Sequence, residues 1–316
     1  MRSRSAAAAD SPETEPLSSI RTGDAYRLVE EVEDDSVDLL ITSPPYWGMR
    51  TYGLPHDESV LDEWRSVGCT DERTPPFDWY SRAGGVLGLE PYPHWYIDHL
   101  VEFFSKARRT LRSTSSLWVN LGDTYFARWS SIRDSGRQGL NGGRTRRRTP
   151  SGGYLHDKQL LLVPARFAIA MQDQGWILRN DLIWAKPNPM PRPERDRLRM
   201  SHEHWFHFVQ RQPGGRRPSY YYDLDAAEPG ALDVVVHDPP ATANGHSATF
   251  PIDFVKRRIL TSTPPRGLVL DPFSGSGTAL VAAAELGRRA LGFEASAKYT
   301  RSARSRLKKV LEKADE

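Results

Sequence analysis

The sequence is very poor in cysteine, because Cys69 is the only one among 316 residues. A single thiol excludes an intramolecular disulfide and any metal site built from several thiolates. Long apolar runs are also absent, since none approaches the ~18 residues that a membrane-spanning helix needs. Residues 1–16 lack the apolar core of a signal peptide, so we expect a disordered tail there and a cytoplasmic protein.

Other common signals are missing as well. The chain has no internal repeat, and the phosphate-binding pattern that ends in Gly-Lys-Ser/Thr does not occur. The segment HEHWFH at 202–207 resembles a zinc-binding H-E-x-x-H, but Phe206 stands where the second histidine belongs. We therefore predict no metal site at these histidines.

Strand-like and helix-like segments alternate along most of the chain. Helices are expected at 25–33, 91–111, 163–175, 251–260, 277–287 and 296–313, and strands at 37–42, 116–121, 176–187, 202–209, 267–271 and 288–294. The Arg-, Gly- and Ser-rich stretch 127–154 has no periodicity and predicts a long surface loop. Repeated strand–helix alternation indicates one α/β domain over 17–316, with a Rossmann-like, largely parallel sheet and helices on both faces.

A glycine loop near the C-terminus is the strongest local signal. In LVLDPFSGSGTALVAAAELGRRALGFE a strand ends at Asp271, and a helix begins at about Gly277. Ligands of open α/β sheets bind at such strand ends, and glycine lets them approach the backbone. The dinucleotide pattern G-x-G-x-x-G fails because position 280 is Leu. An acid follows at the end of the next strand, Glu294, which is typical of a carboxylate that binds the ribose of a nucleoside cofactor.

The stretch TSPPYWG at 42–48 places two prolines directly after a buried strand. Proline fixes φ and restricts the residue before it, so Pro44 and Pro45 should hold Ser43 in a rigid, extended backbone. Neither proline has an N–H. The carbonyls of Ser43 and Pro44 are thus expected to face outward as acceptors beside the serine hydroxyl.

Two aromatic residues follow these acceptors. Tyr46 and Trp47 offer flat faces on which a base could stack. Acceptors beside an aromatic platform suit a planar ring that carries an amino group, as in cytosine or adenine. Two acceptors that hold the amino hydrogens would direct the nitrogen lone pair toward a methyl donor. Cys69 lies in no Pro-Cys motif of the kind that methylation at carbon 5 would use.

Positive charge is concentrated in one segment. Net charge is only +3, but seven arginines and one acid lie between Phe126 and Gly153. Arginine suits phosphate and guanine through its planar fork. The alternative is a solvated loop without a partner.

Together these motifs resemble the β group of DNA amino-methyltransferases, with the catalytic motif TSPPYW near the N-terminus and the cofactor motif DPFSGSGTA near the C-terminus. Further blocks, such as SLWVNLGDTY, WILRNDLIWAKPNPMP and HEHWFHFV, are similar to family blocks. The resemblance covers most of residues 20–300.

The resemblance implies S-adenosylmethionine as cofactor and a base flipped out of double-stranded DNA. It assigns the base and its amino group to Ser43, Pro44, Pro45 and Tyr46. It assigns the cofactor to Asp24, Asp271, Pro272, Phe273, Ser274, Gly275, Ser276, Gly277, Thr278 and Glu294, with residues 249–251 near the methionine end. We expect DNA contacts from Arg144, Arg146, Arg147, Arg148 and Trp47, and recognition insertions at about 124–158 and 188–246.

In this family a serine before Pro-Pro-Tyr is associated with the N4 of cytosine and an aspartate with the N6 of adenine. Ser43 therefore favours cytosine N4, with adenine N6 as the alternative. Methylation of RNA or of a protein glutamine, and DNA binding by a catalytically silent protein, are the rival functions. Some family members form homodimers or accompany a restriction endonuclease, and both are candidate partners here.

Overall fold

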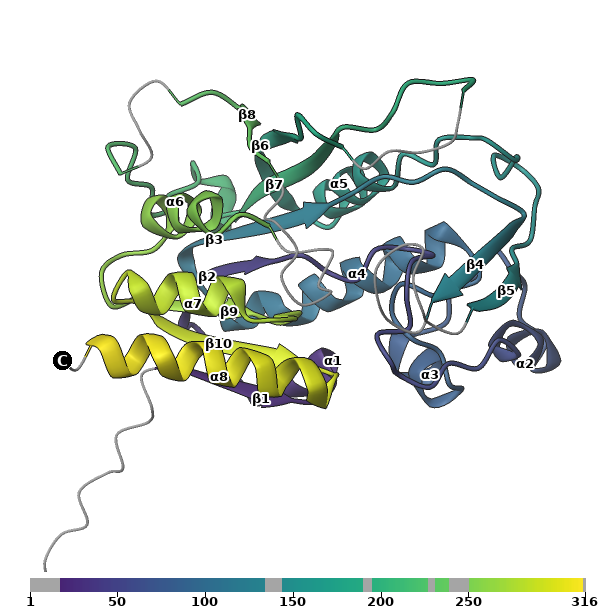
Figure 1. Ribbon diagram of the computed structural model, residues 1–316, viewed down its shortest axis with the longest axis horizontal. Helices are drawn as coiled ribbons and strands as arrows, with labels where there is room; N and C mark the ends of the chain where they lie inside the picture. The colour runs from purple at the N-terminus through teal and green to yellow at the C-terminus, as the bar shows by residue number, and fades with distance from the viewer. Residues whose placement is uncertain (1–17, 134–143, 190–194, 227–230, 239–249, 315–316) are drawn as a thin grey trace, which may run out of the picture.

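The computed structural model describes residues 18–133, 144–189, 195–226, 231–238 and 250–314. Its centre is an eight-stranded sheet in the order β1-β10-β9-β2-β3-β7-β6-β8 (Figure 1). The bounds in that order are Ser18–Thr22, Arg289–Glu294, Leu268–Asp271, Val37–Thr42, Leu111–Leu121, His202–Gln210, Trp176–Ala185 and Val234–Val236. The predicted tail at 1–16 lies outside the described residues.

The sheet is mostly parallel, which confirms the predicted α/β fold. Among the described strands of this sheet, only β7 runs against its neighbours, β3 and β6. The central strands are continuous apolar runs because both of their faces are covered. In β2, for example, Leu39, Leu40 and Ile41 have no exposed surface.

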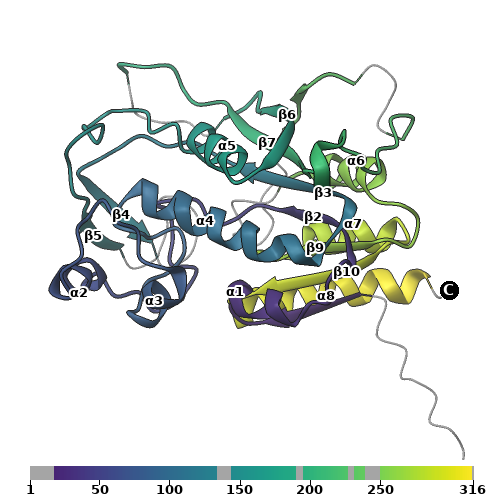
Figure 2. The same cartoon turned by 180° about the vertical axis from the view of Figure 1, so that it is seen from behind.

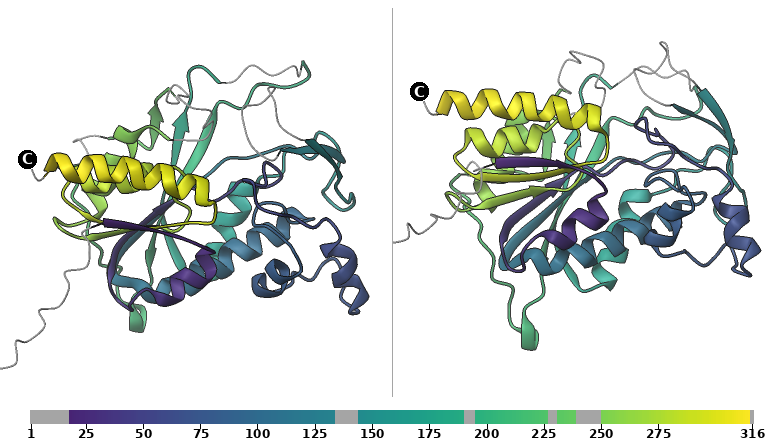
Figure 3. Two further views of the ribbon diagram at one scale, coloured as in Figure 1. Left: turned by 60° about the horizontal axis from the view of Figure 1, so that its bottom comes forward. Right: turned by 90° about the horizontal axis from the view of Figure 1, so that it is seen from below.

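Helices form a layer on each face of the sheet. One layer contains α6 (Ile252–Ser262), α7 (Thr278–Glu285) and α8 (Ala297–Ala314), and the other contains α1 (Ala25–Leu28), α4 (Pro93–Ala107) and α5 (Val163–Asp173). Figure 2 shows α4 and α5 in front of the sheet, and the right-hand view of Figure 3 shows the sheet between α8 and α4. No helix in these described ranges is long and apolar enough to cross a membrane.

Each face of the sheet has its own hydrophobic core. Phe103 and Phe104 of α4 pack with Phe167 of α5 on one side, and all three are fully buried. On the other side, Phe254 of α6 packs with Trp205 of β7. Burial of aromatic side chains of this size is a main contribution to the stability of such a fold.

The predicted loop at 127–154 is wrong in part, because it contains an antiparallel hairpin of β4 (Trp129–Arg133) and β5 (Arg144–Arg148). Arginine and serine supply no period-two apolar alternation, so the pattern hid these strands. The predicted insertion at 188–246 is too broad, since β7 and β8 belong to the central sheet. The sequence patterns also failed to predict the short elements β1, α2 (Val60–Ser66) and α3 (Phe77–Arg82).

Candidate active site

A cavity of about 890 Å³ lies at the edge of the sheet where β2, β9 and β10 end. The proline corner lines it through Ser43 to Tyr46, and the glycine loop lines it through Pro272 to Ser276. These two motifs are more than 220 residues apart in sequence. The parallel arrangement of adjacent strands brings them together, because parallel strands end at one edge.

The proline corner is hydrogen-bonded to α4. Tyr96 Oη donates a hydrogen bond of 2.8 Å to the Pro45 carbonyl. The next turn is held by a 2.7 Å bond from Gly48 N to the carbonyl of Gly88. These two bonds add to the restraint that the prolines impose, so the corner is rigid, as the sequence predicts.

A polar network joins the two hydroxyls of this corner. Ser43 Oγ lies 3.2 Å and Tyr46 Oη 2.7 Å from Asn120 Oδ1. Tyr46 Oη also lies 2.9 Å from Glu203 Oε2, and Lys186 forms an ion pair with Glu203. Burial, followed by the Glu203 carboxylate, raises the pKa of Tyr46 well above 10, so this phenol stays protonated at neutral pH.

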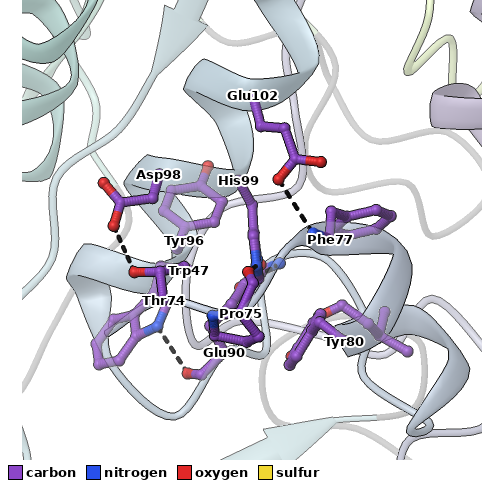
Figure 4. A network of polar contacts seen from close by, with 12 residues as sticks. Trp47, Thr74, Pro75, Phe77, Tyr80, Glu90, Tyr96, Asp98, His99 and Glu102 are labelled. Carbon is purple, nitrogen blue, oxygen red and sulfur yellow. Dashed lines mark hydrogen bonds and ion pairs between the residues drawn. The ribbon is translucent and has the colours of Figure 1, made fainter. Parts of the chain in front are cut away.

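Trp47 does not offer the stacking face that the sequence suggested. Its side chain is only 7% exposed, and its indole N–H donates to the backbone carbonyl of Glu90 at 3.0 Å. Figure 4 shows this contact inside a buried network around His99, whose ring nitrogens lie 3.0 Å from Glu90 Oε1 and 2.9 Å from the Pro75 carbonyl. The predicted DNA contact of Trp47 is therefore wrong, because its indole belongs to the core.

The glycine loop and the acid at the end of β10 meet as predicted. Gly275 N donates to Glu294 Oε2 at 2.9 Å, and Ser296 N donates to Glu294 Oε1 at 2.7 Å. Burial raises the pKa of Glu294, while these two backbone donors act in the opposite direction. Gly275 has φ +52°, a left-handed conformation that glycine adopts without strain.

Two predicted cofactor residues do not line the cavity. Asp271 is 1% exposed and accepts hydrogen bonds from Thr42 Oγ1 and Phe273 N. Gly277, with φ +80°, sits where an added Cβ would lie 2.8 Å from the Cβ of Ala303 in α8. Both residues act behind the cavity: Asp271 ties two strand ends together, and Gly277 lets α7 and α8 approach each other.

Another part of the cavity wall combines a carboxylate with aromatic rings. Asp24 precedes α1 and accepts a 3.0 Å bond from Tyr26 N, while burial raises its pKa. Tyr26 stacks on Phe77 with ring centroids 3.6 Å apart, and both line the cavity with Phe273. This wall suits a flat, partly apolar ligand with hydrogen-bond donors.

The segment after the proline corner lines another part of the cavity. Tyr52 lines the cavity near Tyr299 of α8, and the two rings meet edge to face with their centroids 6.5 Å apart. Burial raises the pKa of Tyr52 to about 12, so this hydroxyl is neutral at physiological pH. Sequence patterns did not reveal this wall, because it comes from a segment without a motif.

The four arginines predicted to bind DNA all lie on β5. The hairpin is fixed at its base, where Arg128 N donates to Asp157 Oδ1 at 2.6 Å. Figure 1 shows it on the side of the sheet toward which β2 and β3 point. Of the segment 249–251 that was predicted near the cofactor, Thr249 falls outside the described residues, and Phe250 lines the cavity.

Sequence reasoning missed Asn120, Glu203 and Lys186, all of which line the cavity. Asn120 ends the block SLWVN, and Glu203 lies within the histidine-rich strand that was considered only for a metal. A polar residue at the end of an apolar strand was the available signal. In the described part of the chain no cluster of His, Cys, Asp and Glu could hold a metal ion.

Comparison with known proteins agrees with this geometry. The model of the DNA methylase family matches residues 37–305. The Type II methyltransferase M.SmaI of Serratia marcescens is 34% identical over 301 residues, which cover 91% of this chain and 90% of that protein. The Type II methyltransferase M.Cfr9I of Citrobacter freundii is 34% identical over 294 residues, covering 90% and 86%.

Solved structures share the fold. The PvuII DNA methyltransferase (cytosine-N4-specific) superimposes with a TM-score of 0.63 at 18% identity, over 93% of this chain and 90% of that one. The putative DNA modification methylase TTHA0409 of Thermus thermophilus was solved in complex with S-adenosyl-L-methionine. It superimposes with a TM-score of 0.56 at 21% identity, over 93% of this chain and 94% of that one. The chain belongs to the DNA methylase family, in its β group of amino-methyltransferases.

Proposed function

We propose that this protein methylates the exocyclic N4 of a cytosine flipped out of double-stranded DNA, with S-adenosylmethionine as cofactor. One observation carries the proposal: the Ser43–Tyr46 corner, the glycine loop Pro272–Ser276 and Glu294 line a single cavity. The family is that of DNA methylases, and the two sequence relatives are Type II methyltransferases. One structural neighbour is named as cytosine-N4-specific, which supports the choice of base.

The residues present fit the cofactor. Two partly buried carboxylates, Asp24 and Glu294, line the cavity and can accept hydrogen bonds from an amine or from ribose hydroxyls. The side chains and backbone that would hold the rest of it are Tyr26, Pro272, Phe273, Ser274, Gly275, Ser276 and Thr278. When bound, S-adenosylmethionine supplies an electrophilic methyl group.

The proline corner would hold the target base. The amino nitrogen of cytosine is a poor nucleophile because its lone pair is delocalised into the ring. The Ser43 hydroxyl oxygen and the Pro44 carbonyl can accept the amino hydrogens. Pro45 fixes the corner through its bond from Tyr96. Holding both hydrogens orients the lone pair and stabilises the positive charge that develops on nitrogen.

DNA binding is assigned to the β4–β5 hairpin. Arg144, Arg146, Arg147 and Arg148 would supply a salt-dependent affinity for phosphates. The Type II names of the relatives support a restriction–modification setting with a cognate endonuclease as a partner. A homodimer is a further proposed partner state, taken from the family resemblance.

The test is direct. The protein is incubated with S-adenosylmethionine and unmethylated genomic DNA, which is then digested to nucleosides for mass spectrometry. N4-Methylcytosine is the expected product. N6-Methyladenine would keep the family chemistry but overturn the base assignment. Bound cofactor without any methylated DNA base would shift the function to RNA, to a protein glutamine or to DNA binding alone.

A further inference from the structure

The two hydroxyl groups of the catalytic corner can each donate or accept a hydrogen bond. This ambiguity matters for an amino substrate. A hydroxyl that donates to the amino nitrogen occupies the lone pair that must attack, whereas a hydroxyl oxygen that accepts an amino hydrogen leaves this lone pair free. A carboxylate has no such choice, because it can only accept. A serine at position 43 therefore needs a neighbour that takes its hydrogen.

Asn120 has the geometry of that neighbour. Its Oδ1 lies 3.2 Å from Ser43 Oγ and 2.7 Å from Tyr46 Oη. An amide oxygen has two lone pairs and can accept both hydroxyl hydrogens. Asn120 lies near the end of β3, beside β2, where it is 1% exposed and lines the cavity.

The orientation of the Asn120 amide is set by a third contact. Its Nδ2 donates to the backbone carbonyl of His204 at 3.1 Å. A flipped amide would place its oxygen against that carbonyl oxygen and its NH₂ against the two hydroxyls. The pairing of β3 with β7 thus determines that an acceptor, rather than a donor, faces Ser43 and Tyr46.

Glu203 reinforces the arrangement at Tyr46. The Tyr46 hydroxyl has one hydrogen and two acceptors within reach, Asn120 Oδ1 and Glu203 Oε2. Lys186 pairs with the other oxygen of Glu203 and holds the carboxylate in place. With either acceptor, the hydrogen of the Tyr46 hydroxyl is directed at the protein and away from the substrate.

We infer that Asn120 is a positioning residue for methyl transfer: its Oδ1 accepts the hydroxyl hydrogen of Ser43 and shares that of Tyr46 with Glu203, so that the Ser43 oxygen faces the target amino group as an acceptor beside the Pro44 carbonyl. This inference rests on the proposed function, since it concerns the same site and an amino substrate. It predicts a role in turnover and none in cofactor binding, because Asn120 Oδ1 is directed at the two hydroxyls.

The experiment compares Asn120→Leu with Asn120→Asp in the full chain. Leucine has a similar size but no acceptor, and kcat should fall roughly 10²-fold, as when one oriented polar group is removed from other active sites. The KM for DNA and the calorimetric Kd for S-adenosylmethionine should stay within about 3-fold, well under the tenfold that corresponds to 1.4 kcal/mol.

Aspartate keeps the acceptor and should retain most of the activity that leucine loses. A protonated aspartic acid also reproduces the donor to His204, so its activity relative to the wild type should rise as the pH is lowered. Asn120→Leu should show no such recovery. Equal defects in the two variants, or a parallel loss of cofactor affinity, would show that Asn120 only supports the fold.

A double-mutant cycle provides an independent check. In the Ser43→Ala background the serine hydroxyl is absent, so Asn120 has one hydrogen fewer to accept. Asn120→Leu should therefore lower kcat by a smaller factor in this background than in the wild type. Equal costs in both backgrounds would overturn the inference while leaving the proposed function intact. If the wild-type protein forms no methylated base, the proposed function falls, and the inference falls with it.

Discussion

Thr42 Oγ1 donates a hydrogen bond of 2.7 Å to Asp271 Oδ1, although 229 positions separate the two residues in sequence. Thr42 is the last residue of β2, and Asp271 is the last residue of β9. The bond therefore joins the strand that leads into the proline corner to the strand that leads into the glycine loop. Both residues are buried, so the two halves of the site are tied together beneath the cavity.

Asp271 should make the stability of the protein depend on pH. Burial raises its pKa from 3.8 to about 7. Between these values the unfolded chain has released a proton that the folded chain retains, so stability falls as the pH rises, by up to about 4 kcal/mol. Asp271→Asn keeps the acceptor for Thr42 but does not titrate. The free energy of unfolding, measured with urea, should rise in the variant relative to the wild type between about pH 4 and about pH 7. Parallel pH profiles would contradict this account.

The corner residues should act on turnover rather than on cofactor affinity. Ser43→Ala and Tyr46→Ala remove groups that line the part of the cavity proposed to hold the base. We expect methyl transfer to fall roughly 10²-fold or more, while calorimetry with S-adenosylmethionine shows near-normal binding. An equal loss of turnover and binding in these variants would refute the assignment of this corner to the base.

Glu294 should have the opposite signature. Glu294→Gln keeps the size of the side chain but removes the charge, and cofactor affinity should fall roughly 10- to 100-fold, as is typical of hydrogen bonds to a charged group. Because burial raises the pKa of Glu294, the wild-type affinity should weaken on acidification earlier than it would for an exposed glutamate. The glutamine variant should lack this acid limb. Ser43→Ala is the matched control, and unchanged affinity in Glu294→Gln would remove Glu294 from the cofactor site.

Two glycines in the left-handed region separate packing from backbone strain. Gly277 and Gly287 have φ of +80° and +67°. An added Cβ meets Ala303 in the first case and nothing within 4 Å in the second. Gly287→Ala should lower the free energy of unfolding by about 1 kcal/mol because of backbone strain. Gly277→Ala should lower it by about 1–3 kcal/mol more because the added methyl group meets α8 at the α7–α8 contact. Chemical denaturation measures both, and equal costs would show that the helix contact relaxes freely.

The β5 arginines should set the salt dependence of DNA binding. Replacing Arg144, Arg146, Arg147 and Arg148 by glutamine should weaken binding to all sequences and reduce the slope of log K against log salt by about 0.9 for each phosphate that is no longer neutralised. The control is Arg301→Gln, which replaces an exposed arginine of α8, a helix that lies away from the hairpin in Figure 1. The affinity for DNA is measured by fluorescence anisotropy at a series of salt concentrations. An equal effect of the control substitution would exclude a special role for the hairpin.

The sequence by itself determined the fold class, the two motifs and their order. These follow from local rules: apolar periodicity marks strands and helices, two prolines make a rigid corner, and glycines after a strand permit a tight loop. The position of Glu294 in the site was predictable for the same reason, because it ends the strand that follows the glycine loop.

Only the tertiary structure decided which side chains surround the proline corner. Asn120, Lys186 and Glu203 come from three separate segments of the chain, and the registers of β3, β6 and β7 bring them to Ser43 and Tyr46. Trp47 turned into the core and Asp271 toward Thr42 because packing and buried hydrogen bonds, which involve residues far away in sequence, set their directions. Local patterns contain no information about such partners, since contacts across strands depend on how the whole chain folds.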